Sequence, residues 1–546
     1  MLLVDARRLT GPNLFSESPL VVVELALDVP DVLEHVEEVY LAELARMRTS
    51  LGLVPDVAPM VRAHRGGAVI AYEAPLDVML PFTEMSEWAA LSACEVLRSR
   101  APLSLEPKRT EIATMLAAEE NPQLNAVAVE AAARDLPFLW DDEQVTVGSG
   151  PRSVTWPRAQ VPRSGDVPWD TLGRIPVALV TGTNGKTTTA RLLARMAREA
   201  GHRVGSTSSD GVVIGNELVE KGDWTGPAAA RTVLRRQDVD VAVLETARGG
   251  ILRRGLAIHD CDVAAITNVS EDHTGSYGID DLQAMTRVKA VVARAVRPGG
   301  TIVLNARDPK LVSLASMFRT RITFFADMVD AAPLVSPTVI ATASAILVDG
   351  RELVKLEEVP ITFGGAARYN VENALAAVAL AQALGFGDDA ILRALRGFDP
   401  AENPRRGEIA TRNGVRVMLD YGHNPAGVRA VLSLVASLRG SGRLTVVTGA
   451  AGDRTNHEIA EMARSIANAK PHRIIVRDLP DYLRGRLPGE VPKLFTRALE
   501  GLGMQTETVA SEVAALETAF EDASEGDFVL VLVHLDRDAV HAYLAS

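Results

Sequence analysis

The central part of the chain alternates short apolar runs with stretches of helical period. Strand-like apolar runs lie at 177–180, 239–244, 263–267 and 301–304. Between them, apolar residues recur at the three- and four-residue spacing of amphipathic helices. Such alternation is typical of βαβ units, whose parallel strands form a sheet that helices cover on both faces. The pattern therefore predicts an α/β domain with a mostly parallel sheet over residues 172–400.

Different patterns flank this domain. The segment FDPAENPRRG at 398–407 contains two prolines and a glycine, which interrupt regular structure. Strand-like runs then resume, and we expect a smaller, Rossmann-like α/β domain over 401–546. Residues 1–145 mix short β-branched runs with helical stretches, which favours an α+β domain. Residues 146–171 are rich in Pro and Gly and lack periodicity, which is typical of a linker.

The composition narrows the classes of function. The 546 residues include 57 Lys and Arg against 70 Asp and Glu, a net charge of −13, and aromatic residues make up 4%. Nucleic-acid binding requires basic surfaces and stacking rings, so we expect no such partner. No apolar run approaches the ~20 residues that cross a bilayer, and the first residues lack a signal-peptide pattern. With only two cysteines and no disulfide framework, we expect a cytoplasmic protein without a membrane partner.

One segment carries a phosphate-binding pattern. The apolar run at 177–180 leads into TGTNGKTTT (181–189), and a helical stretch follows. Glycines let backbone N–H groups approach phosphate oxygens, and a helix N-terminus adds the positive end of its dipole. We expect Lys186 to reach the β- and γ-phosphates of ATP and the Thr187 hydroxyl to reach Mg²⁺. The loop is a variant, because Val180 replaces the first glycine of the usual pattern. The predicted nucleotide-binding residues here are Gly182, Thr183, Asn184, Gly185, Lys186, Thr187 and Thr188.

Two polar residues follow neighbouring strand-like runs. Glu245 comes directly after the run at 239–244, and His273 follows the run at 263–267. Ligands of open parallel sheets gather at the carboxyl ends of the strands, and Mg²⁺ needs few protein groups beside the phosphates. Glu245, His273 and Thr187 are therefore candidate metal ligands. A phosphate loop with a metal site still does not distinguish a ligase from a kinase, a switch or a transporter.

Longer strings resemble the Mur ligase family. They are TGTNGKTTT, Glu245, the segment from Asn268 to His273, and DYGHNP (420–425). The likeness runs from about 172 to 540. Within the family, STSSDG (206–211), LETARGGILRRGLA (244–257), CDVAAITNVSEDH (261–273) and LRGRLPGE (483–490) are similar to the Mur-type half of cyanophycin synthetase. The resemblance implies an ATP-dependent enzyme, with a phosphate-loop central domain, that joins a carboxylate to an amine.

The resemblance also implies roles for single residues. Catalytic roles are implied for Lys186, His273, Lys289 and Arg406, and nucleotide contacts for Asn370, Asn373, Arg406 and Asp420. Lys289 matches a family lysine that can be carbamylated, although a solvated lysine is the simpler alternative. Arg406 ends the segment Asn-Pro-Arg-Arg, which resembles the family's Asn-Pro-Gly-Arg with Arg405 in place of the glycine. An arginine there would meet the γ-phosphate, and the fork of its guanidinium suits phosphate oxygens.

Substrate contacts are implied for a further group of residues: Arg248, Arg253, His423, Asn424, Asp453 and Arg454. Asp453 and Arg454 lie in a loop that resembles one receiving the incoming amino acid, but an ordinary solvated turn is an equal alternative. Arg248 and Arg253 lie in the string closest to cyanophycin synthetase. They indicate either recognition of an acidic acceptor, such as an aspartyl or glutamyl carboxylate, or plain surface solvation.

The N-terminal third resembles the first domain of cyanophycin synthetase at 7–13 and 35–43. The family often carries His-x-x-Glu-His there; His35 and Glu38 remain, but Val39 replaces the second histidine and offers no lone pair to a metal. Those synthetases also carry an ATP-grasp domain before the Mur-type half, where this chain has only the segment 146–171. We therefore expect one ligation reaction rather than two. The resemblance also implies a homo-oligomer, because members of the family commonly form homo-oligomers.

The implied chemistry is activation of a carboxylate as an acyl phosphate by ATP, followed by attack of an amino acid or amine. It requires positioning and charge neutralisation rather than a protein nucleophile. Two alternatives stay open. One is a folylpolyglutamate-type ligase with the same core, and the other is a nucleotide-binding regulator or scaffold without catalysis.

Overall fold

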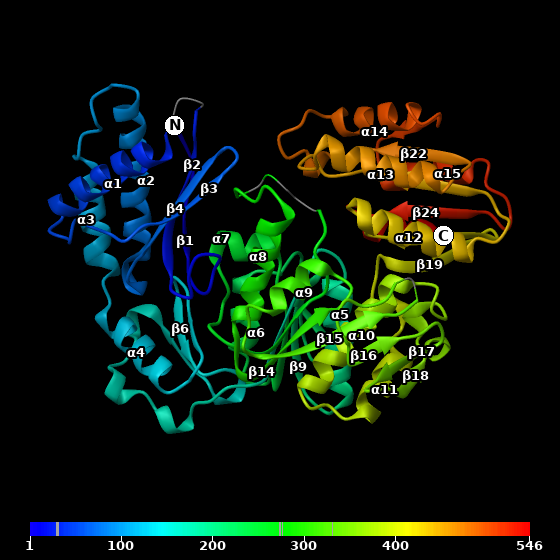
Figure 1. Cartoon of the computed structure of the whole chain (residues 1–546), viewed down its shortest axis with the longest axis horizontal. Helices are drawn as coiled ribbons and strands as arrows, with labels where there is room; N and C mark the ends of the chain where they lie inside the picture. The colour runs from blue at the N-terminus through cyan, green and yellow to red at the C-terminus, as the bar shows by residue number, and fades with distance from the viewer. Residues whose placement is uncertain (29–31, 272–274, 276, 330) are drawn as a thin grey trace.

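The computed structural model describes residues 1–28, 32–271, 275, 277–329 and 331–546. Three parts follow one another along the chain. In Figure 1 the N-terminal part (blue to cyan) and the C-terminal part (yellow to red) lie on opposite sides of the green central part. The predicted α/β class is confirmed: a small sheet with helices comes first, and two larger α/β sheets follow. Among the described residues, none of the helices is long and apolar enough to cross a membrane.

The N-terminal part is an antiparallel sheet covered by helices. Its core forms where α1 and α2 pack on one face of the sheet. The strand order is β1-β2-β4-β3, so β1 is an edge strand. The elements are β1 (Leu2–Leu9), β2 (Leu20–Ala26), α1 (Leu33–Ser50), β3 (Met60–His64), β4 (Gly67–Glu73), α2 (Met79–Leu97), α3 (Lys108–Glu119) and α4 (Pro122–Ala133).

The segment expected to be a linker has structure of its own. A small antiparallel sheet consists of β5 (Phe138–Trp140), β6 (Gln144–Val147) and β7 (Val154–Pro157). The buried side chains of Val161 and Val167 pack in the same cluster. The sequence pattern missed this because apolar residues spaced by Pro and Gly have neither helical nor strand period, yet still bury surface.

The central part is an eleven-stranded sheet with helices on both faces. Its order is β11-β10-β9-β12-β8-β13-β14-β15-β16-β17-β18, and the strands from β9 to β16 are parallel. The strands are β8 (Val177–Thr181), β9 (Val204–Ser208), β10 (Gly211–Ile214), β11 (Glu217–Lys221), β12 (Val241–Glu245), β13 (Cys261–Ile266), β14 (Val296–Asn305), β15 (Arg321–Asp327), β16 (Val339–Ala341), β17 (Ala345–Val348) and β18 (Arg351–Lys355). The helices are α5 (Lys186–Glu199), α6 (Pro227–Leu234), α7 (Arg248–Arg254), α8 (Leu282–Arg294), α9 (Pro309–Ala315), α10 (Arg368–Ala383) and α11 (Asp388–Gly397).

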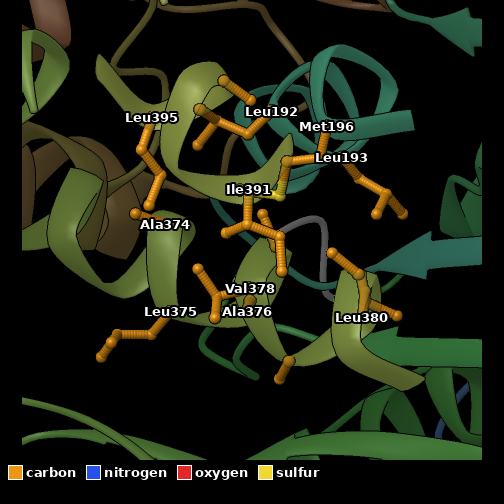
Figure 2. Close-up of a cluster of buried hydrophobic side chains, with 14 of the residues drawn as sticks. Leu192, Leu193, Met196, Ala374, Leu375, Ala376, Val378, Leu380, Ile391 and Leu395 are labelled. Atoms are coloured by element: carbon orange, nitrogen blue, oxygen red, sulfur yellow. The ribbon is translucent and has the colours of Figure 1, made fainter. Parts of the chain in front are cut away.

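Side chains of each central strand alternate between two cores. Along β8, Ala178 and Val180 face a core built with α5, α10 and α11, while Val177 and Leu179 face a core built with α6 to α9. Figure 2 shows the first of these cores, where Ile391 of α11 lies among side chains of α5 and α10. Burial on both faces explains why these strands are continuous apolar runs in the sequence. It also fixes β8, and the loop that follows it, at the centre of the sheet.

The C-terminal part is a six-stranded sheet, parallel except for β19, in the order β19-β20-β24-β21-β22-β23. Helices α12 to α14 cover one face, and α15 and α16 cover the other. The elements are β19 (Arg406–Arg412), β20 (Val415–Asp420), α12 (Pro425–Leu438), β21 (Leu444–Thr448), α13 (Asn456–Asn468), β22 (Arg473–Arg477), α14 (Glu490–Glu500), β23 (Glu507–Val509), α15 (Glu512–Phe520), β24 (Phe528–Leu532) and α16 (Arg537–Ala545).

Candidate functional site

The phosphate-loop residues connect β8 to α5. Gly185 has φ +87°, a left-handed conformation that favours glycine, and a Cβ there would lie 2.0 Å from Asn373 Oδ1. The backbone N–H of Thr183 donates to the carbonyl of Asn268 (2.9 Å), and that of Asn184 donates to Asn268 Oδ1 (2.9 Å). Lys186 Nζ donates to the Thr183 carbonyl at 3.0 Å, so its ammonium group lies over the loop. The loop thus has the shape and charge of an anion site at a helix N-terminus.

Glu245 and Thr187 meet beside this loop. β12 pairs with β8 in parallel, so Glu245, its last residue, ends at the same edge of the sheet. Thr187 Oγ1 donates to Glu245 Oε2 at 2.8 Å. Burial raises the pKa of the Glu245 carboxyl. The carboxylate and hydroxyl oxygens are donors that Mg²⁺ prefers, and the ion takes few protein ligands when phosphates supply the rest.

This donor set fits Mg²⁺ bound together with a nucleotide rather than a metal held by protein alone. Within the described ranges, no group of three or more His, Cys, Asp or Glu residues is placed to hold a metal ion. His273, a predicted metal ligand and catalytic residue, lies outside the described residues. Lys289 is buried and lines the same cavity as Glu245.

Arg406 crosses from the C-terminal part to the phosphate loop. Its Nη2 atom donates to Thr187 Oγ1 (3.1 Å) and to Ser209 Oγ (3.0 Å). Arg406 begins β19, which directly follows the Pro-rich junction between the two parts. The Thr187 hydroxyl therefore lies between a guanidinium and a buried carboxylate, and the Lys186 ammonium acts on the same carboxylate. This arrangement places positive charge on both sides of the space above the loop, as transfer of a phosphoryl group requires.

Asp210 organises the arginines of the site, and the sequence analysis did not assign it a role. Its carboxylate forms ion pairs with Arg191 (2.7 Å), Arg406 (3.0 Å) and Arg405. Those guanidinium groups hold the pKa of Asp210 well below its usual range, while burial lowers the pKa of Arg191 to about 10. Arg405 has φ +59°, which explains why a glycine suits this position, and its ion pair compensates the strain. The sequence signal that could have indicated Asp210 is the short polar string STSSDG (206–211), at the end of β9.

Amide side chains join the two parts at a second place. Asn424 Nδ2 donates to Asn184 Oδ1 (2.9 Å), and Asn184 Nδ2 donates to Asn424 Oδ1 (3.2 Å). Thr188 and Asn403 are likewise in hydrogen-bond contact at 3.1 Å. Each of these pairs links the phosphate loop or α5 to the C-terminal part. The structure therefore holds the two parts in a closed arrangement around the loop.

Buried polar groups also lie beside the phosphate loop, where Asn373 Oδ1 approaches Gly185. Asn373 Nδ2 donates to Asn370 Oδ1 (3.1 Å), and Asn370 Nδ2 donates to the carbonyl of Ile361 (3.0 Å). Asp420 accepts from the backbone N–H of Gly422 at 2.8 Å. Burial raises the pKa of Asp420 to about 6 and that of Glu372 to about 7. Buried acceptors of this kind suit a ligand that brings hydroxyl and amine donors.

The raised pKa of Asp420 leads to a prediction about stability. Its unfolded pKa is about 3.9, so the folded protein binds the proton more tightly, and stability falls as the pH rises from about 4 to about 6. At pH values above both pKa values, the loss of free energy of unfolding stays constant at about 3 kcal/mol. We expect Asp420→Asn to raise the melting temperature by several degrees at pH 7.5 and much less at pH 4. Thermal unfolding at both pH values measures this.

The exposed Asp56 provides the control for that measurement. Asp56→Asn should leave the melting temperature unchanged at both pH values. If Asp420→Asn changed the melting temperature equally at pH 4 and pH 7.5, the raised pKa of Asp420 would be contradicted.

One cavity of about 1180 Å³ contains most of the predicted residues. It lies between the central and C-terminal parts and reaches the N-terminal part. The predicted residues that line it are Gly182, Thr183, Asn184, Gly185, Lys186, Thr187, Thr188, Glu245, Arg248, Arg253, Lys289, Asn373, Arg406, Asp420, His423 and Asp453. Three predicted residues lie behind the lining. Asn370 and Asn424 support Asn373 and Asn184, and Arg454 is buried against Glu458 (3.5 Å) on α13.

Comparison with known families matches two parts of the chain. Residues 180–381 match the Mur ligase middle domain, and residues 405–532 match the Mur ligase, glutamate ligase domain. Cyanophycin synthetase of Synechocystis sp. is 39% identical over 379 residues, which are 67% of this chain and 43% of that protein. The chain thus spans less than half the length of that relative. UDP-N-acetylmuramoyl-L-alanyl-D-glutamate–2,6-diaminopimelate ligase of Zymomonas mobilis is 26% identical over 65% of this chain and 72% of its own.

Solved structures share the fold. E. coli FolC in complex with ADP superimposes with a TM-score of 0.51 at 21% identity, over 68% of this chain and 90% of FolC. MurF from Acinetobacter baumannii superimposes with a TM-score of 0.50 at 18% identity, over 68% of this chain and 77% of MurF. At these identities the likeness supports the arrangement of the sheets and not a particular substrate.

Proposed function

The chain belongs to the Mur ligase family through its middle and C-terminal domains, and on that premise we propose that it is an ATP-dependent ligase that joins a carboxylate to an amino acid or amine. One observation carries the proposal. Arg406 of the C-terminal domain donates to Thr187 of the phosphate loop, whose hydroxyl also donates to buried Glu245. Such a junction assembles only when the two domains close, which suits a reaction that must exclude water.

The proposed reaction has two steps. An oxygen of the acceptor carboxylate attacks the γ-phosphorus of ATP, the bond to the β,γ-bridging oxygen breaks, and ADP leaves. The amine then attacks the carbonyl carbon of the acyl phosphate, and phosphate leaves with the oxygen that joined it to carbon. The amine gives up a proton, and the products are an amide, ADP and phosphate. Lys186 and Arg406 would neutralise the charge of the transferred group, and no protein nucleophile is needed.

Mg²⁺ would be held by Thr187 and Glu245 together with the nucleotide phosphates, and it would supply charge neutralisation at those phosphates. Asn373 and Asp420 would line the nucleoside end. Between α4 of the N-terminal domain and β8 of the central sheet, a stretch that the structure describes in full, the chain has only the small sheet of β5 to β7 and the segment that follows it, with no inserted ATP-grasp domain, which supports a single ligation. Of the alternatives, a folylpolyglutamate-type ligase shares this core, and a regulator would turn over nucleotide slowly without substrates.

An ADP-release screen tests the proposal. Amino acids and amines are combined with aspartyl and glutamyl peptides and with small carboxylic acids, in the presence of ATP and Mg²⁺. A ligase releases ADP only when an acceptor and an amine are both present, and mass spectrometry then identifies the amide. If the rate of ADP release does not depend on either substrate, the protein is a nucleotide switch. If no pair of substrates raises ADP release above background, the ligase proposal is overturned.

Glu245→Gln gives a second test of the same site. The amide keeps the shape but loses the negative charge, so we expect about a 10–100-fold loss of ADP release and a shift of the Mg²⁺ titration to higher concentration. Initial rates across a Mg²⁺ series measure both quantities. Glu199→Gln is the matched control, because Glu199 pairs with Arg195 (2.9 Å) away from the cavity. An unchanged Mg²⁺ midpoint in Glu245→Gln would remove Glu245 from the metal site.

A further inference from the structure

Arg62 of β3 connects the N-terminal domain to the segment 277–280 of the central domain, which leads into α8. The N-terminal sheet lies beside α7 of the central domain (Figure 1). Arg62 Nη2 donates to the carbonyl of Tyr277 at 2.8 Å, and Arg62 Nη1 donates to the carbonyl of Gly278. A guanidinium donates its hydrogen bonds in a rigid planar geometry, so Arg62 fixes both carbonyls relative to β3.

Two further residues of the β3–β4 hairpin contact the same segment. The ring of His64 packs directly on Gly278, since a Cβ on Gly278 would lie 2.5 Å from His64 Cδ2. The backbone N–H of Arg65 donates to Asp280 Oδ2 at 2.5 Å. We call Arg62, His64 and the backbone of Arg65 the hairpin clamp. Its contacts cover the segment from the first residue to the last.

The backbone of the segment depends on contacts of this kind. Tyr277 has φ +56° and Gly278 has φ +62°, so two consecutive residues are left-handed. A residue other than glycine remains in that region where its surroundings hold it there. Arg7 of β1 also contributes, because its guanidinium lies 5.2 Å from the centre of the Tyr277 ring and donates through Nε to the Leu252 carbonyl of α7 (3.0 Å). The N-terminal domain therefore stabilises a conformation that is unfavourable for the segment alone.

The segment in turn sets the position of α8. Asp281, the next residue, caps this helix: its Oδ1 atom accepts from the N–H of Ala284 (2.7 Å), and its carbonyl accepts from the N–H of Met285 (3.0 Å). Met285 and Lys289 lie on one face of α8, a helical turn apart, and both line the cavity that contains the phosphate loop. A displacement of the helix start is therefore transmitted to the wall of that cavity.

We propose that the hairpin clamp positions α8 for the ligation reaction, with Arg62 as the positioning residue. The proposal rests on the ligase function proposed above. It gives the N-terminal domain a part in the chemistry of the central domain without contact with the transferred phosphoryl group. The phosphate loop is held by separate contacts, such as that of the Thr183 N–H with the Asn268 carbonyl (2.9 Å). Loss of the clamp should therefore lower kcat and leave the binding of ATP intact.

Steady-state kinetics of Arg62→Met test this split, because methionine keeps much of the length of the side chain and removes both donors. ADP release is followed with the substrate pair that gives the fastest turnover in the screen described above. We expect kcat to fall about 10–100-fold, since a misplacement of about 1 Å can have an effect of that size. The KM for ATP should change less than about twofold, because ground-state binding is not affected.

Two variants show whether the donors of Arg62 are responsible. Arg62→Lys keeps the positive charge and can reach a carbonyl, but lacks the planar fork, so it should retain at least about a third of the wild-type kcat. Arg65→Met is the matched control from the same hairpin. It changes an exposed side chain and keeps the backbone N–H that contacts Asp280, so both kinetic constants should stay at their wild-type values.

Hydrogen–deuterium exchange of the full chain, without nucleotide or substrates, measures the clamp itself. Peptides that cover residues 279–289 should exchange at least about tenfold faster in Arg62→Met than in wild type, because the start of α8 opens more often. Peptides that cover β12, at the centre of the sheet, should exchange at the wild-type rate. In Arg65→Met both regions should behave as in wild type.

Gly278→Ala disrupts the same contact from the central domain, because its methyl group would meet the ring of His64. It should show the same loss of kcat with little change in the KM for ATP. Since both substitutions break one contact surface, the double variant with Arg62→Met should lose no more than about threefold beyond Arg62→Met alone. If Arg62→Met does not fold, Gly278→Ala is compared with wild type in its place.

The outcomes separate the two proposals. If wild type releases no ADP with any substrate pair, the ligase function fails, while faster exchange at 279–289 in Arg62→Met still shows that the clamp holds α8. If wild type is active and Arg62→Met keeps the wild-type kcat, or if its exchange rises equally in β12, the clamp proposal is overturned. Equal losses of kcat in Arg62→Met and Arg65→Met, or in Arg62→Met and Arg62→Lys, would also overturn it, as would multiplicative losses in the double variant.

Discussion

Lys186→Ala is expected to reduce ADP release at least about 10²–10³-fold, the effect of removing one preorganised charge donor from a transition state. Lys186 Nζ lies over the loop, 3.0 Å from the Thr183 carbonyl. Its ammonium group also opposes the rise in the pKa of Glu245 that burial causes. Without it, the γ-phosphoryl group would lose its positive partner on the central domain, while Arg406 remains on the other side. Coupled-enzyme detection of ADP at saturating ATP measures the loss.

Lys310→Ala is the matched control for this experiment. Lys310 belongs to the same domain, pairs with Asp308 (3.0 Å) at the start of α9, and lies outside the cavity. It should retain wild-type turnover. If Lys186→Ala kept more than about a tenth of the wild-type rate, the loop would not be the site of phosphoryl transfer. Circular dichroism and the melting temperature show whether the variant remains folded.

Asp210→Asn is expected to cause the second large loss, because three arginines depend on one carboxylate. Arg405 and Arg406 come from the C-terminal domain, and Arg191 comes from α5. Removing one partner of a fully buried ion pair costs about 3–5 kcal/mol; these side chains are partly buried, so we expect a smaller cost, which falls on the closed arrangement of the domains. We expect kcat to fall at least about 10²-fold and the radius of gyration without nucleotide to increase. Steady-state kinetics and small-angle scattering measure these effects.

ATP should partly reverse the change in shape, since its phosphates supply negative charge near the same arginines. Asp238→Asn is the control: Asp238 pairs with Arg236 (2.8 Å) on an exposed surface of one domain only. A variant Asp210→Asn that keeps the wild-type radius of gyration and turnover would show that the other contacts between the domains, such as Asn184–Asn424 and Thr188–Asn403, are sufficient to close them.

Several features of the fold and site were predictable because their signals are local. The strands β8, β12, β13 and β14 are buried on both faces, so they contain continuous apolar runs in the sequence. The phosphate loop is contiguous, and its glycines are required by the backbone: φ at Gly185 is +87°. Glu245 was predictable because a residue at the end of a central parallel strand must lie at the edge where ligands gather. His273 was predicted by the same logic but lies outside the described residues.

Other features depend on contacts between distant segments and had no local signal. Asp210 is a single acid in a short polar string, and its importance arises because Arg191 and the consecutive residues Arg405 and Arg406 converge on it from two distant places in the chain. The segment 146–171 lacked periodicity but packs as a sheet and buried side chains. The docking of β1 on α7 joins residues about 245 positions apart in the sequence. Such pairings are set by shape and charge complementarity between finished surfaces.

By itself, the sequence determined the class of fold and the position of the phosphate loop, because burial pattern and backbone conformation are properties of neighbouring residues. It also indicated which polar residues end the central strands. Only the tertiary structure decided how the domains meet: Arg406 on Thr187, Asn424 on Asn184, and an edge strand beside Arg253 and Arg254. The physical reason is that these contacts belong to surfaces that exist only after each domain has folded.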